Sequence, residues 1–180
     1  MEVKQTELEG VLVLSPDVYR DERGCFFETY NDSRFRSFGI PPAASFVQDN
    51  QSESHKGVLR GLHFQTNPNA QGKLVRVVKG SVLDVVVDLR KRSSTFGGYH
   101  AQIIDERIFL WVPEGFAHGF LSLEDNTIFC YKVTAPYAKE SESGIIWNDP
   151  KLNLPWRIAN PVVSEKDRKL PNFDRNLDYF

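Results

Sequence analysis

Short apolar runs separated by polar turns dominate this sequence and restrict it to folds built from β-strands. The stretch KLVRVVKGSVLDVVVDLR, residues 73–90, places two apolar runs around Lys79-Gly80, which is typical of a β-hairpin. The same form recurs over residues 100–113, around Asp-Glu-Arg, and over residues 119–133, around Glu-Asp-Asn. Many short strands at regular spacing favour an all-β sandwich or barrel with few helices.

Length and charge narrow the class of protein further. The chain has 180 residues with no low-complexity tract and no repeat, so we expect a single domain over residues 1–180. The net charge of −2 argues against a nucleic-acid binder, and no apolar run is long enough to cross a membrane. The start of the chain is polar and acidic, and two cysteines in apolar surroundings indicate buried free thiols. We therefore expect a cytoplasmic protein.

Helical signals are confined to two short segments. NDSRFRSFG, residues 31–39, predicts one short helix that is capped by Asn31 or Asp32 and ended by Gly39. Near the end of the chain, Ser164 is a candidate N-cap of a short turn that Pro171 stops.

A histidine motif points to one particular kind of β-barrel. PEGFAHGF, residues 113–120, resembles the second motif of the cupin superfamily, in which the histidine begins a strand that faces the barrel lumen. Metal-binding cupins also carry an H-x-H pair, but here His63 is followed by Gln65 in the corresponding place. A neutral amide is a poor ligand for a transition metal, so we expect no metal site. A metal-dependent cupin remains an alternative.

The stretch VLRGLHFQ, residues 58–65, contains a contradiction between strand geometry and chemistry. Strict alternation along a strand would place Arg60 and His63 on opposite faces, because they are three residues apart. For both side chains to enter one pocket, a bulge near Gly61 must break the alternation.

Seven blocks of sequence, in order, resemble the dTDP-4-dehydrorhamnose 3,5-epimerase family, a group of metal-free cupins that use no cofactor. The similarity runs from about residue 8 to about residue 172. The blocks are RDERGCFFETY, FVQDNQSESHKGVLRGLHFQ, QGKLVRVVKGSVLDVVVDLR, SSTFG, PEGFAHGF, YKVTAPYAKESESGIIWNDP and VSEKDRKLP.

The resemblance implies an isomerase that inverts C3 and C5 of dTDP-4-dehydro-6-deoxy-D-glucose to give dTDP-4-dehydro-L-rhamnose. Both carbons are alpha to the C4 ketone, so the reaction needs a base, a group that stabilises the enolate oxygen, and an acid on the opposite face. His63 matches the family's base, and Asp167 matches the carboxylate that orients it. Lys73 matches the enolate-stabilising group and Tyr131 matches the acid.

The resemblance also implies the binding residues and a homodimer with exchanged strands, for which the segment LEGVLVL, residues 8–14, is the candidate. Two alternatives to double epimerisation remain besides the metal-dependent cupin: a mono-epimerase acting at C3 or C5 only, and a catalytically silent module that binds a nucleotide sugar. The implied contacts with the dTDP-linked 4-keto-6-deoxysugar are Arg23, Phe26, Glu28, Gln48, Asn50, Arg60, His118, Tyr137, Glu142 and Lys166.

Overall fold

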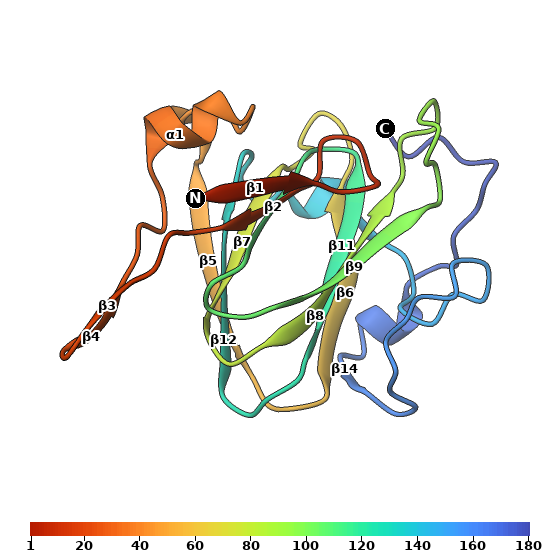
Figure 1. The fold of residues 1–180 in the computed structure, drawn as a ribbon. Coiled ribbons are helices and arrows are strands. Elements are labelled where there is room, and N and C mark those ends of the chain that lie inside the picture. The colour runs from red at the N-terminus through yellow and green to blue at the C-terminus, as the bar shows by residue number, and fades with distance from the viewer.

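The computed structural model describes residues 1–180, and β-strands dominate it (Figure 1). The strands are β1 (Glu2–Gln5), β2 (Leu12–Ser15), β3 (Tyr19–Asp21), β4 (Gly24–Phe26), β5 (Gln48–Ser54), β6 (Val58–Gln65), β7 (Lys73–Lys79), β8 (Val82–Asp88), β9 (Tyr99–Ile104), β10 (Phe109–Val112), β11 (Phe116–Ser122), β12 (Thr127–Val133), β13 (Glu142–Gly144) and β14 (Val162–Val163). The helical elements are α1 (Asp32–Ser37) and the 3-10 turns η1 (Ala43–Ser45), η2 (Lys139–Ser141) and η3 (Asp167–Lys169). None of these helices is long and apolar enough to cross a membrane.

Most of the strands form two sheets that pack face to face. The first sheet has the order β1-β2-β10-β7-β12-β5, and the second has the order β13-β6-β11-β8-β9, with β14 joined in parallel to β6. Apart from β1–β2 and β8–β9, neighbouring strands in each sheet are not consecutive in sequence, as in a jelly roll built by crossing between sheets. The predicted all-β fold with few short helices is confirmed.

Three of the strand pairs that the sequence predicts as hairpins are instead crossings between the sheets. β7 and β8 flank Gly80 but belong to different sheets. β9 and β10 also belong to different sheets, and so do β11 and β12. At the first crossing Gly80 has φ +84°, and a Cβ there would lie 2.6 Å from the Thr127 hydroxyl oxygen. The predicted strands are therefore right and the predicted pairings are wrong, because a tight turn can change sheets as readily as it can reverse within one.

The core explains why local alternation could not reveal these pairings. One apolar cluster fills the space between the sheets and includes Val75, Val86 and Phe129. A second covers the outer face of β6, β8 and β11 with the C-terminal part of the chain, including Trp156 and Phe173. Two strands of the second sheet, β8 and β11, are therefore buried on both faces, so their sequences read as nearly continuous apolar runs.

The predicted helix signals are confirmed at their N-terminal caps. The Asn31 side chain accepts a hydrogen bond from the backbone N–H of Arg34 at the start of α1. The Ser164 hydroxyl oxygen accepts from the backbone N–H of Asp167 at 3.0 Å, at the start of the turn η3.

The N-terminal third of the chain contains the segment expected to exchange and a projecting hairpin. β2, which overlaps the segment expected to exchange, is paired on both edges within its own chain, with β1 and with β10. Exchange of this segment between subunits stays a prediction. β3 and β4 form a hairpin that pairs with no other strand and projects away from the sheets (Figure 1). Cys25 on this hairpin is exposed, contrary to the expectation of a buried thiol.

Candidate active site

A bulge at Gly61 gives β6 the shape that the site needs. His63 lies opposite His118 on β11, whereas Arg60 lies opposite Phe120, so three residues of one strand span two of the other. Gly61 has φ +127°, and a Cβ there would lie 2.6 Å from the Cα of Gly119. The predicted break in alternation is confirmed, and it brings Arg60 and His63 to the same cavity.

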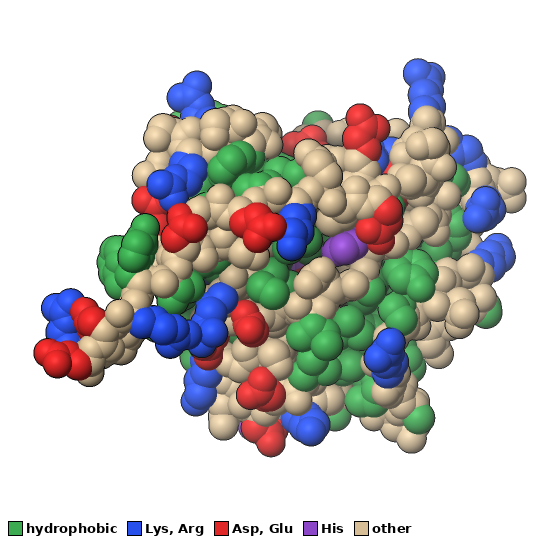
Figure 2. Space-filling view, viewed as in Figure 1, with side chains coloured by type: hydrophobic (Ala, Val, Ile, Leu, Met, Phe, Trp, Pro, Cys, Tyr) green, Lys and Arg blue, Asp and Glu red, His purple; other side chains and the backbone are tan.

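This cavity has a volume of about 470 Å³ and lies between strands of both sheets. On the face shown in Figure 2, a histidine is visible among acidic, basic and hydrophobic side chains. The sequence-predicted residues that line the cavity are Arg60, His63, Lys73, His118, Tyr131, Lys166 and Asp167.

His63 and Asp167 form the central polar contact of the cavity. The His63 Nε2 lies 2.7 Å from Asp167 Oδ1, and the backbone N–H of Gly61 donates to Asp167 Oδ2 at 3.2 Å. Burial alone would raise the pKa of Asp167, but the hydrogen bond and charge of His63, with smaller effects from Gly61 and Ser164, hold that pKa below its usual value. Asp167 therefore stays ionised and fixes one ring nitrogen of His63, which leaves the other nitrogen without a protein partner.

Lys73 supplies a buried cation beside the imidazole. Its Nζ donates to the backbone carbonyl oxygen of His63 at 3.1 Å. Burial lowers the pKa of Lys73 to about 8, and the charges of Asp84 and Glu142 oppose this effect. The ammonium group can therefore stabilise negative charge in the cavity at neutral pH.

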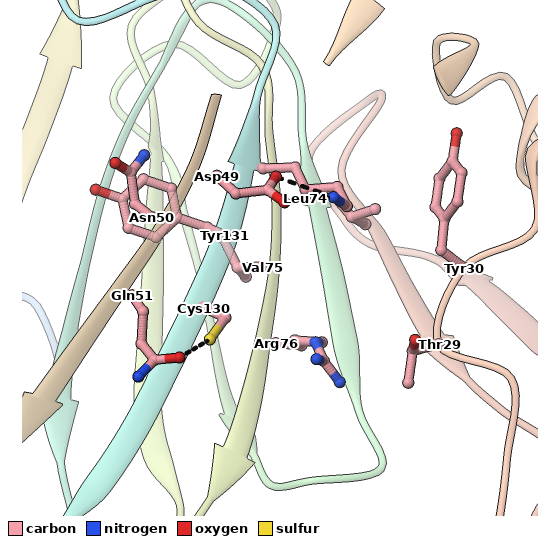
Figure 3. Close-up of a pocket in the computed structure, with 11 residues that line it drawn as sticks. Thr29, Tyr30, Asp49, Asn50, Gln51, Leu74, Val75, Arg76, Cys130 and Tyr131 are labelled. Atoms are coloured by element: carbon pink, nitrogen blue, oxygen red, sulfur yellow. Dashed lines mark hydrogen bonds and ion pairs between the residues drawn. The ribbon is translucent and has the colours of Figure 1, made fainter. Parts of the chain in front are cut away.

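Tyr131 approaches the cavity from the first sheet. It lies on β12 opposite Asn50 on β5, and Figure 3 shows the two side chains together on one side of the sheet. Burial raises the pKa of the Tyr131 phenol, and the charge of Arg60 opposes this effect. A neutral phenol is a proton donor at pH 7.

The rim of the cavity is held by a chain of charged and polar contacts. Lys166 donates to one carboxylate oxygen of Glu142, and the Tyr137 hydroxyl donates to the other at 2.8 Å. The backbone N–H of Tyr137 donates to the Gln48 side chain, which in turn donates to Asn50 at 2.7 Å. Five of the predicted binding residues are therefore linked beside the cavity.

The hydrogen bonds of the Gln65 side chain bear on whether it could be a metal ligand. Its side-chain amide donates to the carbonyl oxygens of Asn69 and Pro136 and accepts from the backbone N–H of Ala138 at 2.8 Å. The amide thus holds the loop that carries Tyr137, and it is not directed at a metal position between His63 and His118.

Three predicted binding residues are not brought to this cavity. Arg23 and Phe26 lie on the β3–β4 hairpin, where 72% of Phe26 is exposed and Arg23 pairs with Asp21. Glu28 lies at the base of the hairpin and accepts from the Asn31 side chain at 3.0 Å.

Two functional contacts escaped the sequence analysis. The His118 Nε2 lies 2.9 and 2.8 Å from the two carboxylate oxygens of Asp84, which is almost fully buried. The Ser54 hydroxyl oxygen accepts from Arg60 Nε at 3.1 Å and holds the guanidinium at the cavity. The signal for Asp84 was a single carboxylate inside the apolar run SVLDVVVD. No comparable signal marked Ser54.

The arrangement provides the groups needed to remove a proton from a carbon next to a carbonyl. His63, oriented by Asp167, can act as a base from the wall formed by the second sheet, and Tyr131 can act as a proton donor from the wall formed by the first. Lys73 lines the same cavity, and its ammonium group can stabilise an enolate oxygen there.

Known proteins of similar sequence and structure are named as nucleotide-sugar epimerases. The family model described as dTDP-4-dehydrorhamnose 3,5-epimerase matches residues 5–175. The dTDP-4-dehydrorhamnose 3,5-epimerase of Shigella flexneri is 48% identical over 183 residues, covering 100% of this chain and 99% of that protein.

Two solved structures extend the comparison to ligand complexes. The enzyme of that name from Bacillus anthracis, with TDP and pyrophosphate bound, has a TM-score of 0.91 at 44% identity and covers 96% of this chain and 99% of its own. A dTDP-6-deoxy-D-glucose-3,5-epimerase from Legionella pneumophila, in complex with dTDP-4-keto-L-rhamnose, has a TM-score of 0.90 at 41% identity, with coverages of 98% and 93%. The predicted enzyme class, an isomerase of nucleotide sugars, agrees with all three names. This chain belongs to the dTDP-4-dehydrorhamnose 3,5-epimerase family.

Proposed function

We propose that this protein inverts C3 and C5 of dTDP-4-keto-6-deoxyglucose to give dTDP-4-keto-L-rhamnose. The observation that carries the proposal is the His63–Asp167 pair, which lies in the same cavity as Lys73 and Tyr131. Family membership supports the substrate class, because a relative of this fold holds dTDP-4-keto-L-rhamnose. No metal or other cofactor takes part in the proposed reaction.

The free ring nitrogen of His63 removes the proton from a carbon alpha to the C4 ketone. The electron pair of the broken C–H bond moves into the enolate, and its negative charge develops on the C4 oxygen. Asp167 stabilises the imidazolium that forms, because its carboxylate accepts the hydrogen bond from the other ring nitrogen. Lys73 stabilises the enolate oxygen through its positive charge.

Tyr131 returns a proton to the same carbon from the other side. His63 belongs to β6 in the second sheet and Tyr131 to β12 in the first, so the base and the acid reach the sugar from opposite walls. Removal from one face and return to the other inverts the carbon. The His63 imidazolium then releases its proton to solvent and the Tyr131 phenolate takes one up, so the same enolate chemistry can invert the second alpha carbon.

Deuterium incorporation tests the proposal. In heavy water, we expect NMR of dTDP-4-keto-6-deoxyglucose with the wild-type protein to show solvent deuterium at both C3 and C5 of the product. Incorporation at one carbon only would identify a mono-epimerase. No incorporation at either carbon would reject the epimerase, and loss of activity after chelator treatment would favour a metal-dependent cupin.

The remaining predicted binding residues, Arg23, Phe26 and Glu28, support a homodimer. The β3–β4 hairpin exposes Arg23 and Phe26. None of its residues lines the cavity that contains His63 in the same subunit. We propose that the protein is a homodimer in which Arg23, Phe26 and Glu28 complete the nucleotide site of the partner. The guanidinium would pair with phosphate oxygens and the aromatic ring would stack on the base.

Mixing two inactive variants tests this exchange of residues. A dimer of one Arg23→Ala chain and one His63→Ala chain has one intact site only if the hairpin serves the partner. We expect activity to appear when the two variants are unfolded together and refolded as a mixture. Activity no higher than the sum of the separately refolded variants, or a monomer in sedimentation, would contradict the exchange.

A further inference from the structure

We propose that Asp84 is a positioning residue for the epimerisation and acts through His118 and Lys73. This inference rests on the proposed function, and it assigns a role to a carboxylate that does not itself line the cavity. Asp84 lies in the middle of β8, opposite Phe120 of β11, and only 1% of it is exposed.

The only hydrogen-bond partner of this carboxylate is His118. Both oxygens of Asp84 lie within 2.9 Å of the His118 Nε2, whereas no backbone N–H donates to it. His118 lines the cavity directly opposite His63 on the neighbouring strand. Asp84 therefore fixes which ring nitrogen of His118 is turned away from the cavity and which remains available to a ligand.

A single hydrogen-bonded partner offsets little of the free-energy cost of burying the Asp84 carboxylate among valines. Removing an ionised carboxylate from water is costly, and such groups persist in protein interiors when opposite charge lies close by. Val82, Val85 and Val86 around Asp84 are fully buried and contribute no charge. Two carboxylates support the charge of the buried Lys73 ammonium, and Asp84 has a larger effect than Glu142.

Asp84 in turn favours the charged form of Lys73. Burial lowers the pKa of Lys73 to about 8, and Asp84 is the first of two carboxylates that oppose this effect. Without Asp84 the pKa of Lys73 falls further, so the cation that stabilises the enolate is lost at a lower pH. The titratable and charged groups around Lys73 in the cavity and at its rim are Arg60, His63, Asp84, His118, Tyr131, Glu142, Lys166 and Asp167.

The pH profile of kcat for Asp84→Asn separates this role from a purely structural one. Lys73 is charged below its pKa, so the loss of activity at high pH should move to lower pH in the variant. If the pKa of Lys73 falls by about one unit, the ratio of variant to wild-type kcat drops about fivefold between pH 6 and pH 8. A variant that is merely less stable would show a ratio that does not change with pH in this range.

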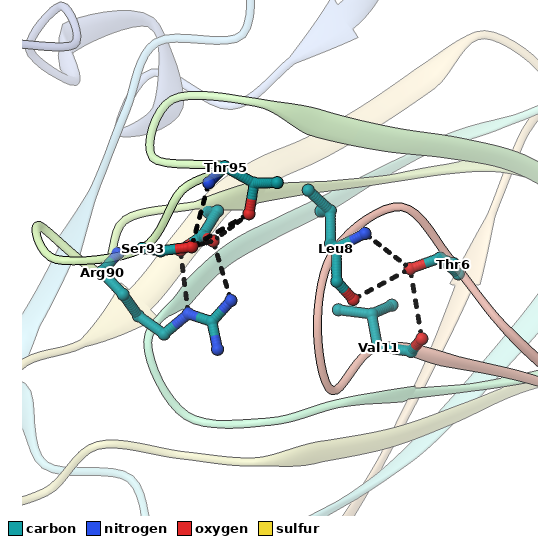
Figure 4. A network of polar contacts seen from close by, with 7 residues as sticks. Thr6, Leu8, Val11, Arg90, Ser93 and Thr95 are labelled. Atoms are coloured by element: carbon teal, nitrogen blue, oxygen red, sulfur yellow. Dashed lines mark hydrogen bonds and ion pairs between the residues drawn. The ribbon is translucent and has the colours of Figure 1, made fainter.

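Asp88→Asn is the matched control. Asp88 lies on the same strand and is fully buried, but it accepts hydrogen bonds from Arg90, Ser93 and Thr95 in a separate network (Figure 4). This substitution should lower thermal stability without moving the high-pH limb of kcat. Asp84→Glu keeps the negative charge, so the fall of its kcat at high pH should return toward the pH at which it occurs in the wild type.

The outcomes distinguish this inference from the proposed function. A wild-type protein that does not exchange deuterium at C3 or C5 would reject the proposed function itself. If the wild type is active, two results would reject only the role of Asp84. In the first, the fall of kcat at high pH occurs at the same pH in Asp84→Asn as in the wild type. In the second, it shifts equally in Asp84→Asn and in Asp88→Asn.

Discussion

Replacing His63 with alanine is expected to lower kcat by about 10²- to 10⁴-fold, the range that a positioned general base contributes. His63 is the one imidazole of the cavity whose partner, Asp167, comes from the C-terminal turn η3 and is itself held by Gly61 and Ser164. Removal of the ring leaves Lys73 and Tyr131 in place but takes away the imidazole that Asp167 orients. Turnover of dTDP-4-keto-6-deoxyglucose measures the effect, with thermal melting as the test of folding.

His55→Ala is the matched histidine control. His55 is exposed, and its nearest acidic partner is Asp125 at 3.9 Å, outside the cavity. We expect this variant to keep its turnover within about twofold of the wild type, because exposed surface substitutions rarely propagate. A folded His63→Ala variant that kept turnover at this level would show that another group removes the proton.

Replacing Gly61 with alanine is expected to destabilise the fold by about 3 kcal/mol or more. The new Cβ would lie 2.6 Å from the Cα of Gly119 and 3.0 Å from the carbonyl oxygen of His118, and backbone atoms of a central strand cannot move aside cheaply. Gly61 also has φ +127°, where an L side chain is strained. Urea unfolding measures the change in the free energy of unfolding.

Gly24→Ala separates backbone strain from the clash. Gly24 has φ +129°, almost the same as Gly61, but a Cβ there meets no atom within 4 Å. We expect about 1 kcal/mol from strain alone at this position. Equal losses at Gly24 and Gly61 would mean that the close approach of β6 and β11 does not constrain the site.

The sequence was sufficient to predict the strands but not their partners. Alternation and turn residues located β7, β8, β11 and β12 closely, because these signals are local. Which sheet each strand joins depends on contacts between distant segments, and β8 and β11 are buried on both faces, so neither strand carries an apolar and a polar side that would indicate its partners.

The site was predictable where a family block or a local conflict marked it. The parity conflict between Arg60 and His63 correctly demanded a bulge at Gly61. The Asp84–His118 contact was not predicted, because its two residues are 34 positions apart and meet only through strand pairing. The sequence also did not predict that Arg23 lies away from the cavity. Arg23 and the cavity residues all belong to blocks that match the family, and matching blocks do not show which residues share a cavity.

The central claim is that a base and an acid act from opposite walls, and Tyr131→Phe in heavy water tests it most directly. Without the phenol, His63 can still remove the proton and return a deuteron to the same face. NMR should therefore show deuterium entering the substrate with retained configuration, while inversion falls by about 10²-fold or more. Inversion at the wild-type rate in this variant would contradict the assignment of the acid to Tyr131.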